Sequence, residues 1–376
     1  MTKEAISNIY RLGVKELWGL AREPLLLILI VYTFTVSIYV AATAMPDSLH
    51  NAAIAIVDED NSALSARIVS SFYPPYFRTP EMISWGDANP GMDSGDYTFV
   101  LNIPPYFQRD VLAGRIPTVQ LNVDATRMSQ AFTGAGYIQQ IVSSEINEFV
   151  QRHRSDASLP VDIALRMRFN QNLEQSWFGS VMEVINNITM LSIILTGAAL
   201  IREREHGTIE HLLVMPVTPS EIMLGKVWSM GLVVLIATGM SLILVVKGML
   251  HVPIEGSIAL FMLAAAMHLC ATTSMGIFLA TLARSMPQFG MLLMLVLLPL
   301  QMLSGGATPR ESMPWFIREV MLLAPTTHFV IIGQAILYRG AGFSVVWPQL
   351  VSLFAIAAVL FSASLTRFRK TISQMA

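Results

Sequence analysis

The chain has 376 residues, of which 53% are hydrophobic and only 13% are charged, and its formal net charge is −2. Soluble domains carry about 25% charged residues, so this composition predicts a membrane protein, and the near-neutral charge excludes a general affinity for nucleic acid. The single cysteine, Cys270, excludes a disulfide framework and a cysteine-based zinc site.

The first 24 residues predict an amphipathic helix that lies on the membrane surface, with an ordinary cytosolic helix as the alternative. Trp18 and the apolar run that follows favour the membrane surface. That run is too long, and begins too late, for a signal peptide. The residues that fall near one helical face are Ile6, Ile9, Tyr10, Val14, Leu17, Trp18 and Ala21, and the charged ones are Lys3, Arg11, Lys15 and Arg22.

Six apolar runs predict an α-helical polytopic membrane protein with six transmembrane helices. The fifth run is the weakest, because it is short and contains Pro299. The expected spans are residues 25–45, 181–201, 227–246, 257–283, 289–303 and 345–365.

The distribution of lysine and arginine predicts that both termini are cytoplasmic, because short cytoplasmic segments are enriched in these residues. The short segments assigned outside hold only Lys247, Arg310, Arg318 and Arg339. The segments assigned inside, which end in a tail at 366–376, hold Lys3, Arg11, Lys15, Arg22, Arg202, Arg204, Lys226, Arg284, Arg367, Arg369 and Lys370.

Residues 46–178 predict a separate α/β domain, inserted between the first two spans and facing outward. This stretch holds nine of the 19 prolines and no lysine. It contains no nucleophile elbow, metal cluster or phosphate loop. Its pattern predicts strands at 53–57, 97–103, 118–123 and 165–169, and helices at 63–72, 105–113 and 129–154.

The charged segment 202–226 lies between the second and third apolar runs, on the side assigned to the cytoplasm. Thr208 predicts the start of a short amphipathic helix that Pro216 ends. The sequence Thr218-Pro219-Ser220-Glu221 predicts a capping box that begins the helix of the third span. Pattern alone leaves open whether the segment binds a partner or is a solvated loop.

The stretch from Glu203 to Pro216, followed by Glu221 and Gly225-Lys226, resembles the coupling-helix signature of permeases of type 2 ATP-binding-cassette (ABC-2) exporters. The similarity covers essentially the whole chain. It extends to Phe169-Asn170-Gln171-Asn172-Leu173 with Trp177-Phe178, and to Leu303-Ser304-Gly305-Gly306 with Pro309, Ser312-Met313-Pro314 and Ala324-Pro325. The sequence departs from the family pattern at Gln171, His206 and Met215.

The resemblance implies that the segment docks on a separate ABC ATPase subunit, which binds ATP and Mg, while this chain binds no cofactor and is not itself an enzyme. It also implies a second permease half, identical or homologous, and residues 304–344 as an outer re-entrant segment. Membrane lipid is a further expected partner, and a periplasmic adaptor a candidate one. The expected location is the bacterial inner membrane. The residues expected to dock, with exposed glutamates, are Glu203, Glu205, Gly207, Thr208, Glu210, Leu212, Leu213, Pro216 and Glu221.

Polar residues inside the spans are candidates for a substrate pathway, because such residues are costly in a membrane. They are Glu183, Asn186, His268 and Gln301. For His268, we favour a neutral side chain bonded to a neighbouring helix over a proton carrier.

Three functions remain open from the sequence. The first is the permease half of an exporter that moves an amphiphilic, drug-like or lipid-like molecule. The second is a proton-coupled secondary transporter, and the third is a membrane-anchored envelope assembly protein. No G-x-x-x-x-G-K-[ST] motif occurs, so ATP hydrolysis is expected on another polypeptide.

Overall fold

A computed structural model describes residues 3–43, 51–124, 128–153, 175–207, 216–308 and 310–373. It divides the chain into two compact units. Unit 1 comprises Met1–Met45 with Gln175–Ala376, and unit 2 comprises Pro46–Glu174. Each unit has its own hydrophobic core, so each is described by itself.

Unit 1 is a helical bundle in which six helices are long and apolar enough to cross a membrane. They overlap the predicted spans, and the second, third and sixth run further at both ends. The candidate spans are Pro24–Thr43, Ser176–Glu205, Pro219–Met249, Ile258–Leu282, Met286–Leu303 and Phe343–Thr371. The helices that form them are α2 (Pro24–Tyr32), η1 (Thr33–Ser37) and α3 (Ile38–Thr43); α8 (Gln175–Glu205); α10 (Pro219–Ser241) and η2 (Leu242–Met249); α11 (Ile258–Leu282); α12 (Met286–Leu303); and α15 (Phe343–Ser373).

The helix α8 is the centre of the bundle. Its span is 83% buried, whereas those of α12 and α15 are each 22% buried and therefore present apolar side chains outward. A seam of small polar residues joins α8 to α11: Ser192 donates to Thr272 Oγ1 at 2.6 Å, and a Cβ at Gly276 would lie 2.5 Å from Thr196 Oγ1. Small residues at such crossings let two helices approach closely in a membrane.

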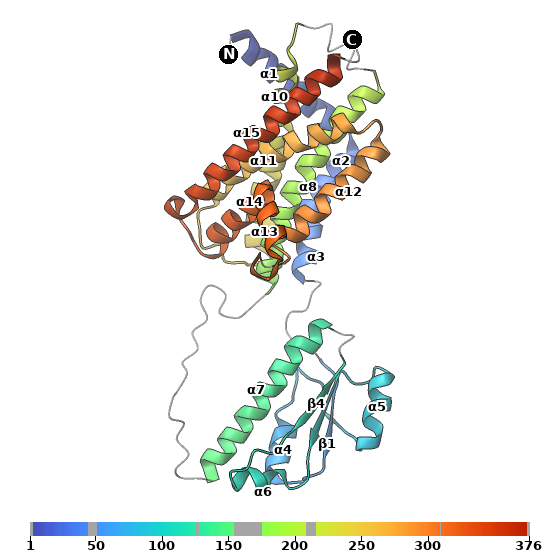
Figure 1. The fold of residues 1–376 in the computed structure, drawn as a ribbon, viewed down its shortest axis with the longest axis vertical. Coiled ribbons are helices and arrows are strands. Elements are labelled where there is room, and N and C mark those ends of the chain that lie inside the picture. Colours follow the sequence, from blue (N-terminus) through green and yellow to red (C-terminus); the bar gives the residue numbers. More distant parts are fainter. Residues whose placement is uncertain are drawn as a thin grey trace. The chain divides into compact units, whose positions relative to one another are not determined.

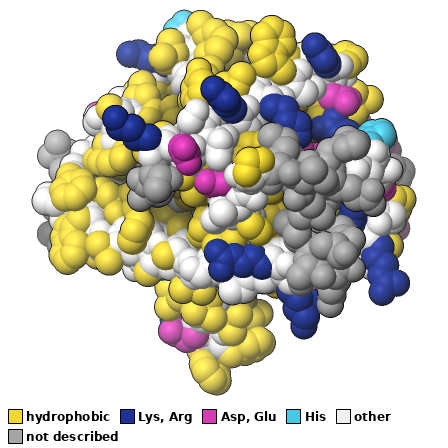
Figure 2. Space-filling model, turned by 90° about the horizontal axis from the view of Figure 1, so that it is seen from above, with side chains coloured by type: hydrophobic (Ala, Val, Ile, Leu, Met, Phe, Trp, Pro, Cys, Tyr) yellow, Lys and Arg dark blue, Asp and Glu magenta, His cyan; other side chains and the backbone are white. Residues whose placement is uncertain are grey.

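The N-terminal helix α1 (Lys3–Ala21) starts, and α15 finishes, at the same end of unit 1 (Figure 1). The last turn of α8 and the first two turns of α10 lie at this end too, since both segments contact α1. We refer to it as the α8-terminal end. Figure 2 shows many lysine and arginine side chains on the molecule seen from that side.

At the opposite end, the chain between α12 and α15 forms a sharply bent helix pair. The pair consists of Trp315–Leu323 and Pro325–Tyr338, which meet at 93°. It contains α13 (Trp315–Val320), η4 (Met321–Leu323), α14 (Pro325–Gly333) and η5 (Gln334–Tyr338), and the short helix η3 (Arg310–Ser312) precedes it. Ala324 is extended and Pro325 begins α14, which accounts for the bend.

Unit 2 is an α/β sandwich around a four-stranded sheet of order β2-β1-β3-β4. The central strand β1 is parallel to β2 and β3, and β4 is antiparallel to β3. One face of the sheet packs on α4, α6 and α7, and the other on α5. The elements are β1 (Ile54–Asp58), α4 (Ala63–Ser70), β2 (Glu81–Met82), α5 (Trp85–Asp93), β3 (Phe99–Ile103), α6 (Phe107–Leu112), β4 (Gln120–Val123) and α7 (Met128–His153).

Three of the expected strands and all three expected helices of unit 2 are present, with ends shifted by one to two residues. The strand expected at 165–169 lies outside the described residues. β2 and α5 were not predicted. β2 has only two residues, and α5 contains Gly86, Gly91 and Pro90, which are poor helix formers.

Candidate functional site

The last turn of α8 consists of the four charged residues 202–205, and each of them contacts a different part of the bundle. Arg202 Nη1 lies 2.7 Å from Glu23 Oε1, at the junction of α1 and α2. This ion pair joins the central helix to the start of the first span.

The next two contacts join α8 to the connection between α11 and α12. The Arg204 guanidinium donates to the Ala283 carbonyl, which follows the last residue of α11. The Met286 amide, the first of α12, donates to Glu205 Oε1 at 3.0 Å. Both contacts satisfy backbone groups that a helix terminus leaves without an internal partner.

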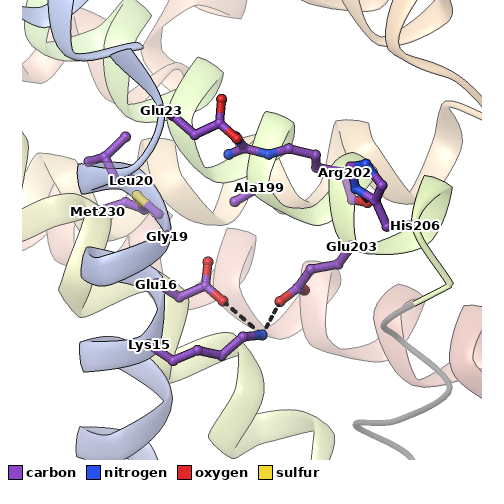
Figure 3. A pocket seen from close by; sticks show the side chains of 10 residues that line it. All are labelled: Lys15, Glu16, Gly19, Leu20, Glu23, Ala199, Arg202, Glu203, His206 and Met230. Carbon is purple, nitrogen blue, oxygen red and sulfur yellow. Dashed lines mark hydrogen bonds and ion pairs between the residues drawn. The ribbon is translucent and has the colours of Figure 1, made fainter. Parts of the chain in front are cut away.

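Glu203 belongs to a cluster of four charges from three helices, of which Lys226 is buried. Lys226 Nζ, on α10, lies 2.7 Å from Glu203 Oε2 and 3.0 Å from Oε1 of Glu16, on α1. Lys15 Nζ, also on α1, lies 2.6 Å from Glu203 Oε1 and 3.7 Å from Glu16 Oε1. Figure 3 shows the Lys15 amine between the two carboxylates. We call these four residues the charge cluster.

Burial makes the charge cluster sensitive to the loss of Lys226, Glu16 or Glu203, whereas Lys15 is exposed. The side chain of Lys226 is 2% exposed, and those of Glu16 and Glu203 are 10% and 12% exposed. A buried charge that loses its partner costs about 3–5 kcal/mol. Burial is also the main reason why the pKa of Glu16 is raised above 4.5; Glu203 raises it further, and Lys226 opposes the shift.

Close packing of α1 on α10 brings the cluster together. A Cβ at Gly13 would lie 2.2 Å from the Trp228 ring, and a Cβ at Gly225 would lie 3.0 Å from Leu12 Cβ. Trp228 Nε1 also donates to the Ile9 carbonyl at 3.1 Å. The two glycines therefore set the distance at which Lys226 can reach Glu16.

A pocket of about 250 Å³ opens beside the charge cluster, between α1 and the last turns of α8 (Figure 3). Its wall combines the charged residues with small and apolar ones from α1, α8 and α10. The ten lining residues are Lys15, Glu16, Gly19, Leu20, Glu23, Ala199, Arg202, Glu203, His206 and Met230.

Two glutamates expected to be exposed for docking are not exposed. Glu203 is taken up by the charge cluster, and Glu221, 9% exposed, accepts the Thr218 amide at 2.7 Å. The expectation was wrong because both residues lie in helices that continue beyond the predicted spans. Residues 202–205 are the end of α8, and residues 219–226 are the start of α10. The capping box at the start of α10 is confirmed.

Glu205, Gly207 and Pro216 are exposed. Gly207 has φ +68°, a left-handed conformation that favours glycine where a helix ends. The remaining residues expected to dock, Thr208, Glu210, Leu212 and Leu213, lie outside the described residues.

His268 is completely buried and contacts both α8 and α14. Its Nε2 is 2.9 Å from Thr189 Oγ1, and its ring stacks on Phe329 with centroids 4.3 Å apart. This is the contact with neighbouring helices that we favoured for His268.

Of the other pathway candidates, Glu183, Asn186 and Gln301 are half-buried. Glu183 accepts a hydrogen bond from Ser37 at 2.7 Å, and one turn further along α8, Asn187 donates to the Thr33 carbonyl at 2.8 Å. Both bonds join α8 to the π-helical segment η1. Glu183 thus has a structural partner in the first span.

The ion pair of Glu16 with Lys226 was not predicted, although the sequence position of each residue indicates that it needs a partner. Glu16 stands four residues from both Leu12 and Leu20, which are buried, so it lies on an apolar face. Lys226 directly precedes the third apolar run. An acid on an apolar face and a base at the edge of a span each require a partner.

In the part of the chain that the structure describes, no group of three or more His, Cys, Asp or Glu side chains could hold a metal ion. The interactions that the charge cluster itself supplies are the ion pairs of Lys15 and Lys226 with Glu16 and Glu203.

Comparison with known proteins gives two consistent results. A family described as ABC-2 family transporter protein matches residues 24–366. The inner membrane transport permease YhhJ of Escherichia coli K12 is 63% identical over 371 residues, covering 99% of both chains. The probable multidrug ABC transporter permease YbhR of the same strain is 28% identical over 370 residues, covering 97% of this chain and 99% of that protein.

Proposed function

The chain belongs to the ABC-2 transporter family, and from this premise we propose that it is the permease half of an ATP-driven exporter in a bacterial inner membrane. Its relatives' names support transport and the inner membrane, and one of them is named a probable multidrug permease. The substrate class that fits the apolar bundle is an amphiphilic small molecule. A second permease copy, or a homologous half, completes the transporter.

The observation that carries the proposal is the junction at the end of α8. Residues 206–218 connect α8 to α10, so a subunit that pushes on this connection acts on both helices. The charge cluster and the contacts of Arg202, Arg204 and Glu205 pass the displacement to α1, α2, α11 and α12. ATP and Mg belong to that separate subunit.

The proposed orientation places the α8-terminal end, and hence both termini, in the cytoplasm. Unit 2 is then the outward-facing domain, and the bent pair of α13 and α14 is a re-entrant segment. Support comes from the exposed bases near that end, which are Lys3, Arg11, Arg22, Arg284, Arg367, Arg369 and Lys370.

Co-purification tests the proposal. The full chain, affinity-tagged and extracted in detergent from its native membrane, is expected to retain an ABC ATPase subunit. Reversal of two charges at the connection, with Glu205→Arg and Glu210→Arg, should release that subunit. The matched control reverses two exposed glutamates at the other end of the bundle, with Glu255→Arg and Glu319→Arg. Full retention by the first variant would refute docking at this segment.

A further inference from the structure

A groove of about 410 Å³ runs along the side of the bundle between the first and third spans. One wall is formed by α2 and η1, including Ile30 and Phe34, and the other by α10 and η2, including Ala237 and Ser241. Almost all of its lining is apolar. It does not share residues with the charge cluster or with the pocket beside it.

Both walls depart from α-helical geometry at the groove. The first wall is π-helical over Thr33–Ser37 and the second over Leu242–Met249. Short π-helical segments inside longer helices are rare and occur frequently at functional sites. The Thr33 carbonyl accepts the Asn187 amide of α8, so the first wall is fixed in place by a buried hydrogen bond. The groove is thus a built feature of the bundle.

Ser241 supplies the one polar group in need of a partner at this groove among the described lining residues. It is 3% exposed, and its hydroxyl has no hydrogen-bond partner in the part of the chain that the structure describes. Hydroxyls on spanning helices usually donate to a carbonyl one turn earlier. Thr238, on the same helix, does so to Val234 at 2.7 Å. The exception at Ser241 leaves a donor available to a bound molecule.

The mouth of the groove faces outward from the bundle. Val31, Ile236 and Met240 are 62%, 55% and 56% exposed, and all three lie in candidate spans. A molecule therefore enters from the hydrocarbon of the bilayer. Ser241 lies about 9 Å along the helix from Lys247, near one end of the candidate span, so the acceptor of a bound molecule would lie close to the edge of the hydrocarbon.

We propose that this groove binds an export substrate dissolved in the bilayer. The substrate is an apolar, drug-sized molecule with an acceptor group to which the Ser241 hydroxyl donates a hydrogen bond. This inference rests on the proposed export function, because it assigns the groove to the transported molecule. A second copy of the chain covering the same face is the competing occupant.

Benzophenone is a suitable probe, because its carbonyl is both a hydrogen-bond acceptor and the photoreactive group. Ultraviolet light is applied to the full-length protein in detergent, and labelled peptides are located by mass spectrometry. Labelling should concentrate in residues 30–35 and 233–245. Ser241→Ala should reduce it about three- to tenfold, the value of one hydrogen bond. Ala237→Phe, which fills the groove, should abolish it.

The matched control is Ala358→Phe, because Ala358 is exposed on α15 away from the groove. It should leave labelling unchanged, and size-exclusion elution identifies any variant that misfolds. Equal labelling of all exposed spans, or labelling that survives Ala237→Phe, would overturn the proposal. So would rapid disulfide dimers of Ile236→Cys in a Cys270→Ser background, since a second copy would then cover the groove. Labelling needs no ATPase, so its failure in a chain that still exports refutes the site and not the function.

Discussion

Lys226 Nζ lies 2.7 Å from Glu203 Oε2, and this contact joins the end of α8 to the start of α10. The two residues flank the connection that we propose as the docking segment. Because Lys226 is buried, separating the two helices there would cost a buried ion pair and leave Lys226 with Glu16 as its remaining partner. A force on the connection therefore moves both helices together.

Replacement of the buried lysine tests this coupling. Lys226→Met removes the cation that faces two carboxylates, and we expect the free energy of unfolding to fall by about 3–5 kcal/mol. Adding Glu203→Gln should recover part of the loss, because one uncompensated charge is removed. Thermal unfolding in detergent measures both effects. Lys247→Met is the control, since Lys247 is exposed. An equal loss of stability in Lys226→Met and Lys247→Met would contradict the coupling.

The raised pKa of Glu16 predicts a pH dependence of stability. A carboxyl group whose pKa is higher in the folded state contributes stability below its unfolded pKa, near 4.5, and loses that contribution as pH rises through the folded value. The side chain of Glu16→Gln cannot ionise, so this variant keeps its stability as pH rises. The stability of Glu16→Gln relative to the unsubstituted protein should therefore increase as pH rises above 4.5. A relative stability that falls over this range would show that the ion pair with Lys226 outweighs burial.

Two glycines of α1 provide a matched pair of substitutions. A Cβ at Gly13 would collide with the Trp228 ring, whereas a Cβ at Gly19 would meet nothing within 4 Å. Gly19→Ala should be neutral or stabilising by up to about 1 kcal/mol, because alanine favours the helix. Gly13→Ala should be destabilising and should increase proteolysis of α1. Equal effects would mean that α1 does not pack on α10 as described.

His268 is predicted to be structural. Substitution with Asn removes its stacking on Phe329 and alters its bond to Thr189, so thermal stability should fall. The pH dependence of transport in membrane vesicles should stay the same. A changed pH profile with normal stability would favour the proton-coupled alternative.

The spans, the capping box at Thr218 and most of unit 2 could be predicted because each follows from a local pattern. The ion pairs of Glu203 could not be predicted, since its partners Lys15 and Lys226 come from helices distant in sequence. The groove at Ser241 was also beyond prediction. It depends on π-helical segments and on a hydrogen bond from Asn187, neither of which leaves a periodic signal in the sequence.

The most direct measurement of the central claim places a cysteine at position 210 in a Cys270→Ser background. The account predicts that Glu210→Cys in intact cells resists a membrane-impermeant maleimide. In inverted vesicles, a bifunctional reagent with one maleimide and one photoreactive group should cross-link it to a co-purifying ABC ATPase subunit. Glu255→Cys, at the other end of the bundle, should show the opposite pattern. Labelling of Glu210→Cys from outside the cell would contradict both the orientation and the docking site.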